Sequence, residues 1–227
     1  MIPIQAGRRT TTTATVTLTL IVLNTVIFFW DRLGAIAGPS RVFADLAMRP
    51  VEVVMALQGA GDKFAMATVL TSMFLHGGFA HLLFNMIFLG TFGQAVESAF
   101  GPPRFALYYL FWGVCAAAAH VFVLPGSDIP MIGASGAIGG VLGVYLLLYP
   151  ASKVQIVLLP FPLPFSVRAW IMLGAWFLWQ VFVRQEGVAN WAHVGGFLAG
   201  MLTVLIMGGP KAMLKHDTTQ EDHDLDD

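Results

Sequence analysis

The chain has 227 residues, of which 57% are hydrophobic and only 11% are charged, whereas an ordinary soluble domain carries roughly 25% charged residues. The mean hydropathy of +0.74 agrees with this, and the net charge of −1 gives no basic surface for nucleic acid. The composition excludes a soluble fold, which could not bury this much apolar surface, and the single cysteine, Cys115, excludes an internal disulfide.

Residues 1–13 are an N-terminal segment, predicted to be cytoplasmic, and an apolar run follows at residues 14–30. A helix needs about 20 apolar residues to cross a bilayer. We expect this run to be a membrane span and not a cleavable signal peptide, because no small-residue cleavage pattern follows it. Five more runs follow, with prolines between several of them: residues 79–96, 105–124, 133–149, 167–183 and 191–207. We predict an all-α fold, a polytopic membrane bundle of six transmembrane helices over residues 14–207.

The loop at residues 31–75 is long and too mixed in character to span a membrane. Its residues 41–57 carry apolar side chains at helical spacing, which favours a short helix lying in the membrane interface. The glycines at 34, 38 and 59–61 indicate loop on either side. At the other end, residues 208–227 finish in an acidic run and are predicted to form a solvated, polar cytoplasmic tail.

Lysine and arginine set the orientation, because cytoplasmic loops carry more of them. With the N-terminus inside, seven such residues lie on the cytoplasmic side and five on the outer side. The Arg8-Arg9 pair before the first run favours the same orientation, so both termini are predicted to be cytoplasmic.

Polar residues at membrane depth are candidates for function, because burying them there is costly. His81 and Asn85 lie four residues apart in the second run, so on a helix they share one face. The fourth run opens Gly133-Ala-Ser135-Gly136, and the sixth opens with His193. In the predicted topology these three runs all start on the outer side. Their polar groups therefore share one level.

Each of these residues also has a structural interpretation. A serine among glycines is usually a packing residue, a lone histidine at a span end is often interfacial, and an asparagine often only ties helices together. The joint pattern favours function, because a serine, a histidine and a His/Asn pair fall at one level on three helices. Small residues line two of these helices and permit close approach: Gly136, Gly139, Gly140 and Gly143 in one, and Gly196 and Gly200 in the other.

Close approach would bring Ser135 Oγ within hydrogen-bonding reach of His193. A serine hydroxyl needs such an adjacent base to become a good nucleophile. No Asp or Glu lies near that level in the last three runs, so we expect a dyad, with no metal and no cofactor. His81, Asn85 and the N–H of Ser135 are the donors available for an oxyanion.

Together these motifs, Gly-Ala-Ser-Gly, His-x-x-x-Asn and Ala-His-x-Gly-Gly-x-x-x-Gly, resemble the rhomboid family of intramembrane serine proteases. The resemblance implies Ser135 as nucleophile, His193 as general base, and His81 with Asn85 as the oxyanion-stabilising pair. It implies structural roles for six further residues. His76 would anchor a loop and Glu97 would tie down a turn before Gly101, and the four motif glycines are Gly133, Gly136, Gly196 and Gly200.

Two positions depart from the family pattern. Where many members carry a Trp-Arg pair in the first loop, this chain has Ala67-Thr68. Where some members place an aromatic ring against the histidine, one turn after the serine, it has Gly139. Something else must hold the loop and the His193 ring.

The resemblance implies cleavage of transmembrane helices of membrane-protein substrates near the outer face of a bacterial plasma membrane. The partners would be the lipid bilayer and those substrates, with no nucleic acid. One alternative is a catalytically inactive rhomboid-like chaperone that binds membrane clients, although such relatives lose the serine or the histidine. A transporter or channel would predict charged residues in several spans, whereas Arg168, Gln180 and Glu97 all lie near span ends.

Overall fold

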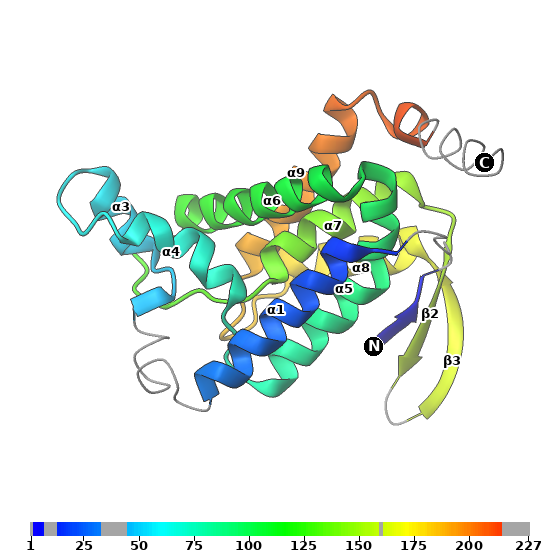
Figure 1. Ribbon diagram of the computed structural model, residues 1–227, viewed down its shortest axis with the longest axis horizontal. Helices are drawn as coiled ribbons and strands as arrows, with labels where there is room; N and C mark the ends of the chain where they lie inside the picture. Colours follow the sequence, from blue (N-terminus) through cyan, green and yellow to red (C-terminus); the bar gives the residue numbers. More distant parts are fainter. Residues whose placement is uncertain (1, 7–12, 33–44, 159–160, 215–227) are drawn as a thin grey trace.

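The computed structural model describes residues 2–6, 13–32, 45–158 and 161–214. Most of them are helical, and a small sheet lies at one end of the bundle (Figure 1). The helices are α1 (Thr15–Arg32), α3 (Pro50–Leu57), α4 (Ala65–Thr71), the 3-10 turn η1 (Ser72–Phe74), α5 (Phe79–Phe100), α6 (Pro102–Val123), α7 (Ser135–Leu148), α8 (Ala169–Phe182) and α9 (Asn190–Ile206). The strands are β1 (Ile2–Gln5), β2 (Lys153–Leu158) and β3 (Phe161–Arg168).

Helices occupy all six positions at which the sequence predicts membrane spans, with bounds that differ by a few residues. Two of them, α5 and α6, are 22 residues each and are apolar enough to cross a bilayer, while the other four are shorter apolar helices. The 14 residues of α7, at about 1.5 Å each, reach across only part of a hydrocarbon layer roughly 30 Å thick. The helical membrane-protein class fits, and the count of six spans stays a prediction.

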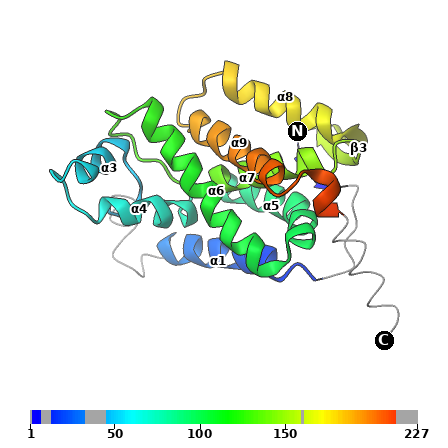
Figure 2. The same cartoon turned by 90° about the horizontal axis from the view of Figure 1, so that it is seen from above.

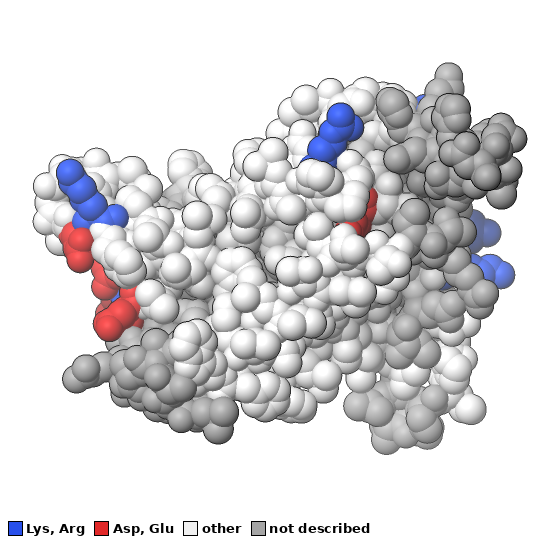
Figure 3. Space-filling model, viewed as in Figure 1, with Lys and Arg blue, Asp and Glu red and all other residues white. Residues whose placement is uncertain are grey.

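The outside of the bundle is largely apolar. Phe122, Phe182 and Ile206 are 86%, 77% and 76% exposed, and each belongs to a different helix. Figure 3 shows one face on which charged side chains are few and lie mostly toward the edges. Apolar surface of this extent marks contact with other apolar matter, which for a bundle of this composition is lipid.

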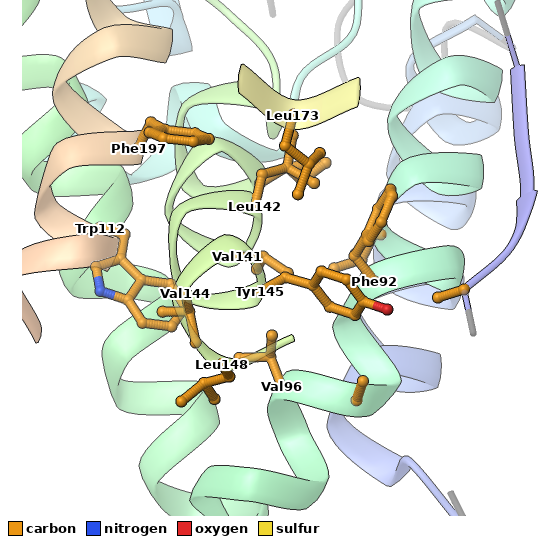
Figure 4. Packing of buried hydrophobic residues seen from close by; sticks show 14 of the residues in the cluster. Phe92, Val96, Trp112, Val141, Leu142, Val144, Tyr145, Leu148, Leu173 and Phe197 are labelled. Carbon is orange, nitrogen blue, oxygen red and sulfur yellow. The ribbon is translucent and has the colours of Figure 1, made fainter. Parts of the chain in front are cut away.

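Helix α7 forms the centre of the fold, with α5, α6, α8 and α9 packed around it (Figure 2). Its sequence is small or apolar on every side, as expected of a fully buried helix. In Figure 4 its side chains pack among Phe92 of α5, Trp112 of α6 and Phe197 of α9. This packing fixes the position of α7 along its own axis, and therefore the position of its first residue, Ser135.

The all-α prediction missed an antiparallel sheet of strand order β1-β2-β3. β2 and β3 form a hairpin that pairs Lys153 with Arg168, and β1 pairs with the other side of β2. Val154 and Ile156 are buried and alternate with the exposed Lys153 and Gln155, which is the period-2 pattern of a half-buried strand. Prolines between the apolar runs indicate breaks between helices, yet Pro162 and Pro164 lie within β3, an edge strand, which accepts proline.

Two predictions at the ends of the bundle meet the structure only in part. Of the predicted interfacial helix at residues 41–57, the described portion contains α3, with residues 33–44 outside it. The polar tail was predicted to start at residue 208, but residues 210–214 are helical and Met213 is buried against the core. Residues 215–227 lie outside the described part.

Candidate active site

Two helix starts meet at the centre of the site. Ser135 is the first residue of α7, and His193 lies in the first turn of α9. The Nε2 atom of His193 lies 2.7 Å from Ser135 Oγ, a hydrogen-bonding distance. The pair is 58 residues apart in sequence, so it exists only because α7 and α9 pack side by side.

Glycines allow this packing. A Cβ atom on Gly196 would overlap the carbonyl oxygen of Gly136, and one on Gly200 would overlap that of Gly140. On the other helix, a Cβ on Gly143 would overlap the carbonyl oxygen of Phe197. Backbone therefore touches backbone along the whole seam, as small-residue motifs permit in membrane helices.

The second ring nitrogen of His193 is also engaged. Its Nδ1 atom lies 2.8 Å from Oε1 of Gln180, a buried residue of α8. Asn190, the first residue of α9, donates from Nδ2 to the same Gln180 oxygen over 3.0 Å. Sequence reasoning did not assign either amide to the site. The available signal was a glutamine in an otherwise apolar run, which is costly without a partner.

His81 and Asn85 lie one turn apart on α5 and face Ser135 across a cavity. Gly133 has φ +117°, and a Cβ there would lie 2.7 Å from His81 Nε2, so only glycine fits. The Nδ2 atom of Asn85 is buried and has no hydrogen-bond partner among the described residues. A buried donor without a partner is rare in proteins and calls for an explanation.

The cavity beside these residues has a volume of about 420 Å³. Its polar groups come from His81, Asn85, Ser135 and His193, and the rest of the lining is mostly apolar. Phe84 and Phe88 of α5, Trp176 of α8 and residues 187–189 contribute to this lining. An apolar cavity with a few convergent polar groups is the usual form of a ligand site.

His76 lies just before α5 and contacts the site through the ring of His81. It is 1% exposed, and its ring packs edge-on against His81 with centroids 5.1 Å apart. Burial and the neighbouring His81 lower the pKa of His76 to about 4, so the ring is neutral near pH 7. This placement fits the loop-anchoring role that the resemblance implies.

The resemblance implies that Glu97 ties down the turn before Gly101, but its carboxylate contacts the start of α1. Its Oε1 accepts the N–H of Val16 over 2.9 Å, and its Oε2 accepts that of Thr17 over 2.7 Å. The carboxylate thus caps the first turn of α1, where free N–H groups and the helix dipole favour an anion. Gly101, with φ +74°, ends α5, and its N–H donates to the backbone carbonyl of Glu97 over 2.8 Å.

The two departures from the family pattern have local accounts. Thr68 is buried in α4, where its hydroxyl donates to the carbonyl of Ala65 over 2.7 Å. A Cβ on Gly139 would lie 2.9 Å from the His193 carbonyl oxygen, so no larger side chain fits there without moving a helix. An aromatic ring at this position is incompatible with the observed packing of α7 on α9.

The sequence profile of the Rhomboid domain matches residues 63–210, well over half of the chain. The chain therefore belongs to the rhomboid family. The match begins after β1, α1 and α3, which lie outside it.

Named relatives agree. The rhomboid protease GluP of Bacillus subtilis is 39% identical over 145 residues, which cover 63% of this chain and 26% of that protein. Rhomboid protein 1, mitochondrial, of Saccharomyces cerevisiae is 30% identical over 142 residues, 60% of this chain and 40% of that protein. Rhomboid-type serine protease 2 of Emericella nidulans is 32% identical over 148 residues, 62% and 27% of the two chains. The matched region thus spans well under half the length of these relatives.

Proposed function

We propose that this protein is an intramembrane serine endopeptidase that cleaves transmembrane helices of membrane-protein substrates. The observation that carries the proposal is the 2.7 Å contact between Ser135 Oγ and His193 Nε2 at the edge of a mostly apolar cavity. Membership of the rhomboid family and the protease names of its relatives support the reaction class.

The first half of the reaction is acylation. His193 Nε2 takes the proton of the Ser135 hydroxyl while Oγ attacks the carbonyl carbon of the scissile peptide bond. The carbonyl oxygen becomes an oxyanion. The protonated His193 then gives its proton to the leaving amine nitrogen, the C–N bond breaks, and an ester to Ser135 remains.

The second half is hydrolysis of that ester. His193 takes a proton from water, the hydroxide attacks the ester carbonyl, and Ser135 Oγ leaves and recovers the proton from His193. Each of the two steps passes through an oxyanion. The donors we assign to it are the buried Nδ2 of Asn85, which has no partner among the described residues, the ring of His81 and the N–H of Ser135.

The orientation and the number of spans belong to the same proposal. With six spans and cytoplasmic termini, the first residue of α7 lies toward the outer face, and substrates are cut near the outer end of their own helices. A peptide bond within an intact helix is hydrogen-bonded and shielded, so the substrate helix must unwind locally to reach Ser135. A bacterial plasma membrane is the membrane we assign.

The test is cleavage of a single-span model substrate by the purified protein in detergent, beside Ser135→Ala and His193→Ala. We expect cleavage by the wild type and background cleavage by both folded variants. An inactive rhomboid-like chaperone would bind the substrate and leave it intact in all three samples. Equal cleavage by the wild type and Ser135→Ala would exclude Ser135 as the nucleophile.

A further inference from the structure

His193 is held on both sides of its ring. Nε2 contacts Ser135 at 2.7 Å, and Nδ1 contacts Oε1 of Gln180 at 2.8 Å. Gln180 is 6% exposed, so this amide has little water to bond with instead. A buried polar side chain that meets a catalytic candidate at this distance is either a structural tie or part of the reaction machinery.

Two backbone groups determine which atom donates and which accepts in the contact between His193 and Gln180. The N–H of Gln185 can only donate, and it reaches Oδ1 of Asn190 over 3.3 Å. The carbonyl of Val183 can only accept, and it lies 3.2 Å from Nδ2 of Asn190. These two partners fix which end of the Asn190 amide carries its oxygen.

The same logic passes along the network. Because Nδ2 of Asn190 also donates to Gln180, the Gln180 atom that it meets must be the oxygen. That oxygen is the atom facing Nδ1 of His193, so Nδ1 must carry a proton. In a neutral imidazole Nε2 then has the free electron pair, and it points at the Ser135 hydroxyl. This is the tautomer that a general base requires.

In the described part of the chain, no other contact of His193 sets this tautomer as firmly. No Asp or Glu is hydrogen-bonded to His193 within the described residues, and Gly139 leaves no ring on the α7 side. Trp176 lies beside the imidazole with ring centroids 5.8 Å apart and an interplanar angle of 35°, which restricts tilt and cannot select a nitrogen. Amide side chains perform the orienting role in papain-like proteases, so a carboxylate is not required.

We propose that Gln180 is the positioning residue of this site. Resting on the proposed protease function, the proposal makes the unit Ser135–His193–Gln180, with Asn190 fixing the Gln180 amide. Loss of the acceptor would leave Nδ1–H without a partner and let the ring populate the wrong tautomer. Such a loss acts on turnover and leaves substrate binding nearly unchanged.

The experiment compares wild type, Gln180→Leu and Gln180→Glu in cleavage of the single-span substrate from pH 5 to 9. We expect Gln180→Leu to lower kcat by about tenfold to a hundredfold, with KM within about twofold of wild type. Gln180→Glu keeps an acceptor oxygen and should recover much of kcat. Its negative charge favours protonated His193, so the acid limb of the profile should move to higher pH. The titratable groups that act on His193 electrostatically, His81 of α5 and His120 of α6, are the same in every variant.

Two controls separate positioning from folding. Thr203→Val removes another buried hydrogen bond between helices, from Trp112 Nε1 to Thr203 Oγ1, away from the site, and should leave kcat unchanged. Gln180→Asn keeps the amide but is too short to reach Nδ1 of His193, so its activity should fall as in Gln180→Leu. It therefore tests the same contact if Gln180→Leu folds poorly. Wild-type kcat and an unchanged pH profile in a folded Gln180→Leu or Gln180→Asn would overturn the proposal. So would a loss that Gln180→Glu fails to reduce. Failure of the wild type to cleave at all would count against the proposed function instead.

Discussion

The carbonyl oxygen of Gly136 in α7 occupies the space that a Cβ atom on Gly196 in α9 would need. The two helices therefore approach as closely as backbones can, and this approach places Ser135 beside His193. The position of the site is a property of the helix seam before it is a property of any polar side chain.

We predict that Gly196→Ala and Gly200→Ala both destabilise the protein and reduce cleavage. The added methyl forces α7 and α9 apart, at a cost of about 1–3 kcal/mol for overpacking, and lengthens the Ser135–His193 contact. Thermal unfolding in detergent and cleavage rates check this. Gly174→Ala in α8 is the matched control, because a Cβ there meets nothing within 4 Å. Equal behaviour of Gly174→Ala and Gly196→Ala would contradict the role given to the seam.

The oxyanion pair gives a second prediction. Asn85→Ala and His81→Ala should each lower kcat by roughly a hundredfold to a thousandfold, because each removes a donor that acts on developing charge. Asn85→Ala should still react with a small fluorophosphonate, since Ser135 and His193 remain. Asn24→Ala is the control, because Asn24 is a buried amide of α1 whose Nδ2 donates to the carbonyl of Leu20 in the same helix. Wild-type turnover in both site variants would rule out their role.

Glu97 gives a prediction about stability. Replacing it with Ala leaves the N–H groups of Val16 and Thr17 without their acceptor, which should cost about 0.5–2 kcal/mol, as for loss of a helix cap. Hydrogen exchange at the first turn of α1 should speed up, while α7 stays protected. Glu52→Ala removes an exposed carboxylate that lies 3.6 Å from the partly exposed Arg49, and should change little. Unchanged exchange at Val16 in Glu97→Ala would show that the cap does not hold α1.

The orientation can be tested with single cysteines. In a Cys115→Ala background, Asp128→Cys lies between α6 and α7 and Lys153→Cys lies at the start of β2, and both parent residues are exposed. We expect an impermeant maleimide to label Asp128→Cys on intact cells and Lys153→Cys only after permeabilisation. Mass spectrometry should place the substrate cut near the outer end of its helix. Labelling of Lys153→Cys on intact cells would reverse the proposed topology.

The sequence predicted those features of the site that depend on local spacing. The four-residue separation of His81 and Asn85 and the glycines around Ser135 are short-range patterns, and the structure brings these residues to one cavity. The contacts of Gln180 and Glu97 could not be predicted from the sequence, because they depend on how the helices pack. Gln180 meets His193 across α8 and α9, and Glu97 caps a helix that starts 82 residues earlier in the chain. A polar residue within an apolar run was the local sequence sign of either contact.

The pairing of β1 with β2 constrains the path of the chain through the bilayer. Two hydrogen-bonded strands must lie on one side of the membrane, so the crossings between Gln5 and Lys153 must be even in number. The parity agrees with α1, α5, α6 and α7 as four crossings. With α7 as a crossing, Ser135 and β2 stand at its opposite ends, so the catalytic pair opens on the side away from residues 2–5. That relation holds whichever side is the cytoplasm, and it links the site to the sheet without any count of charges.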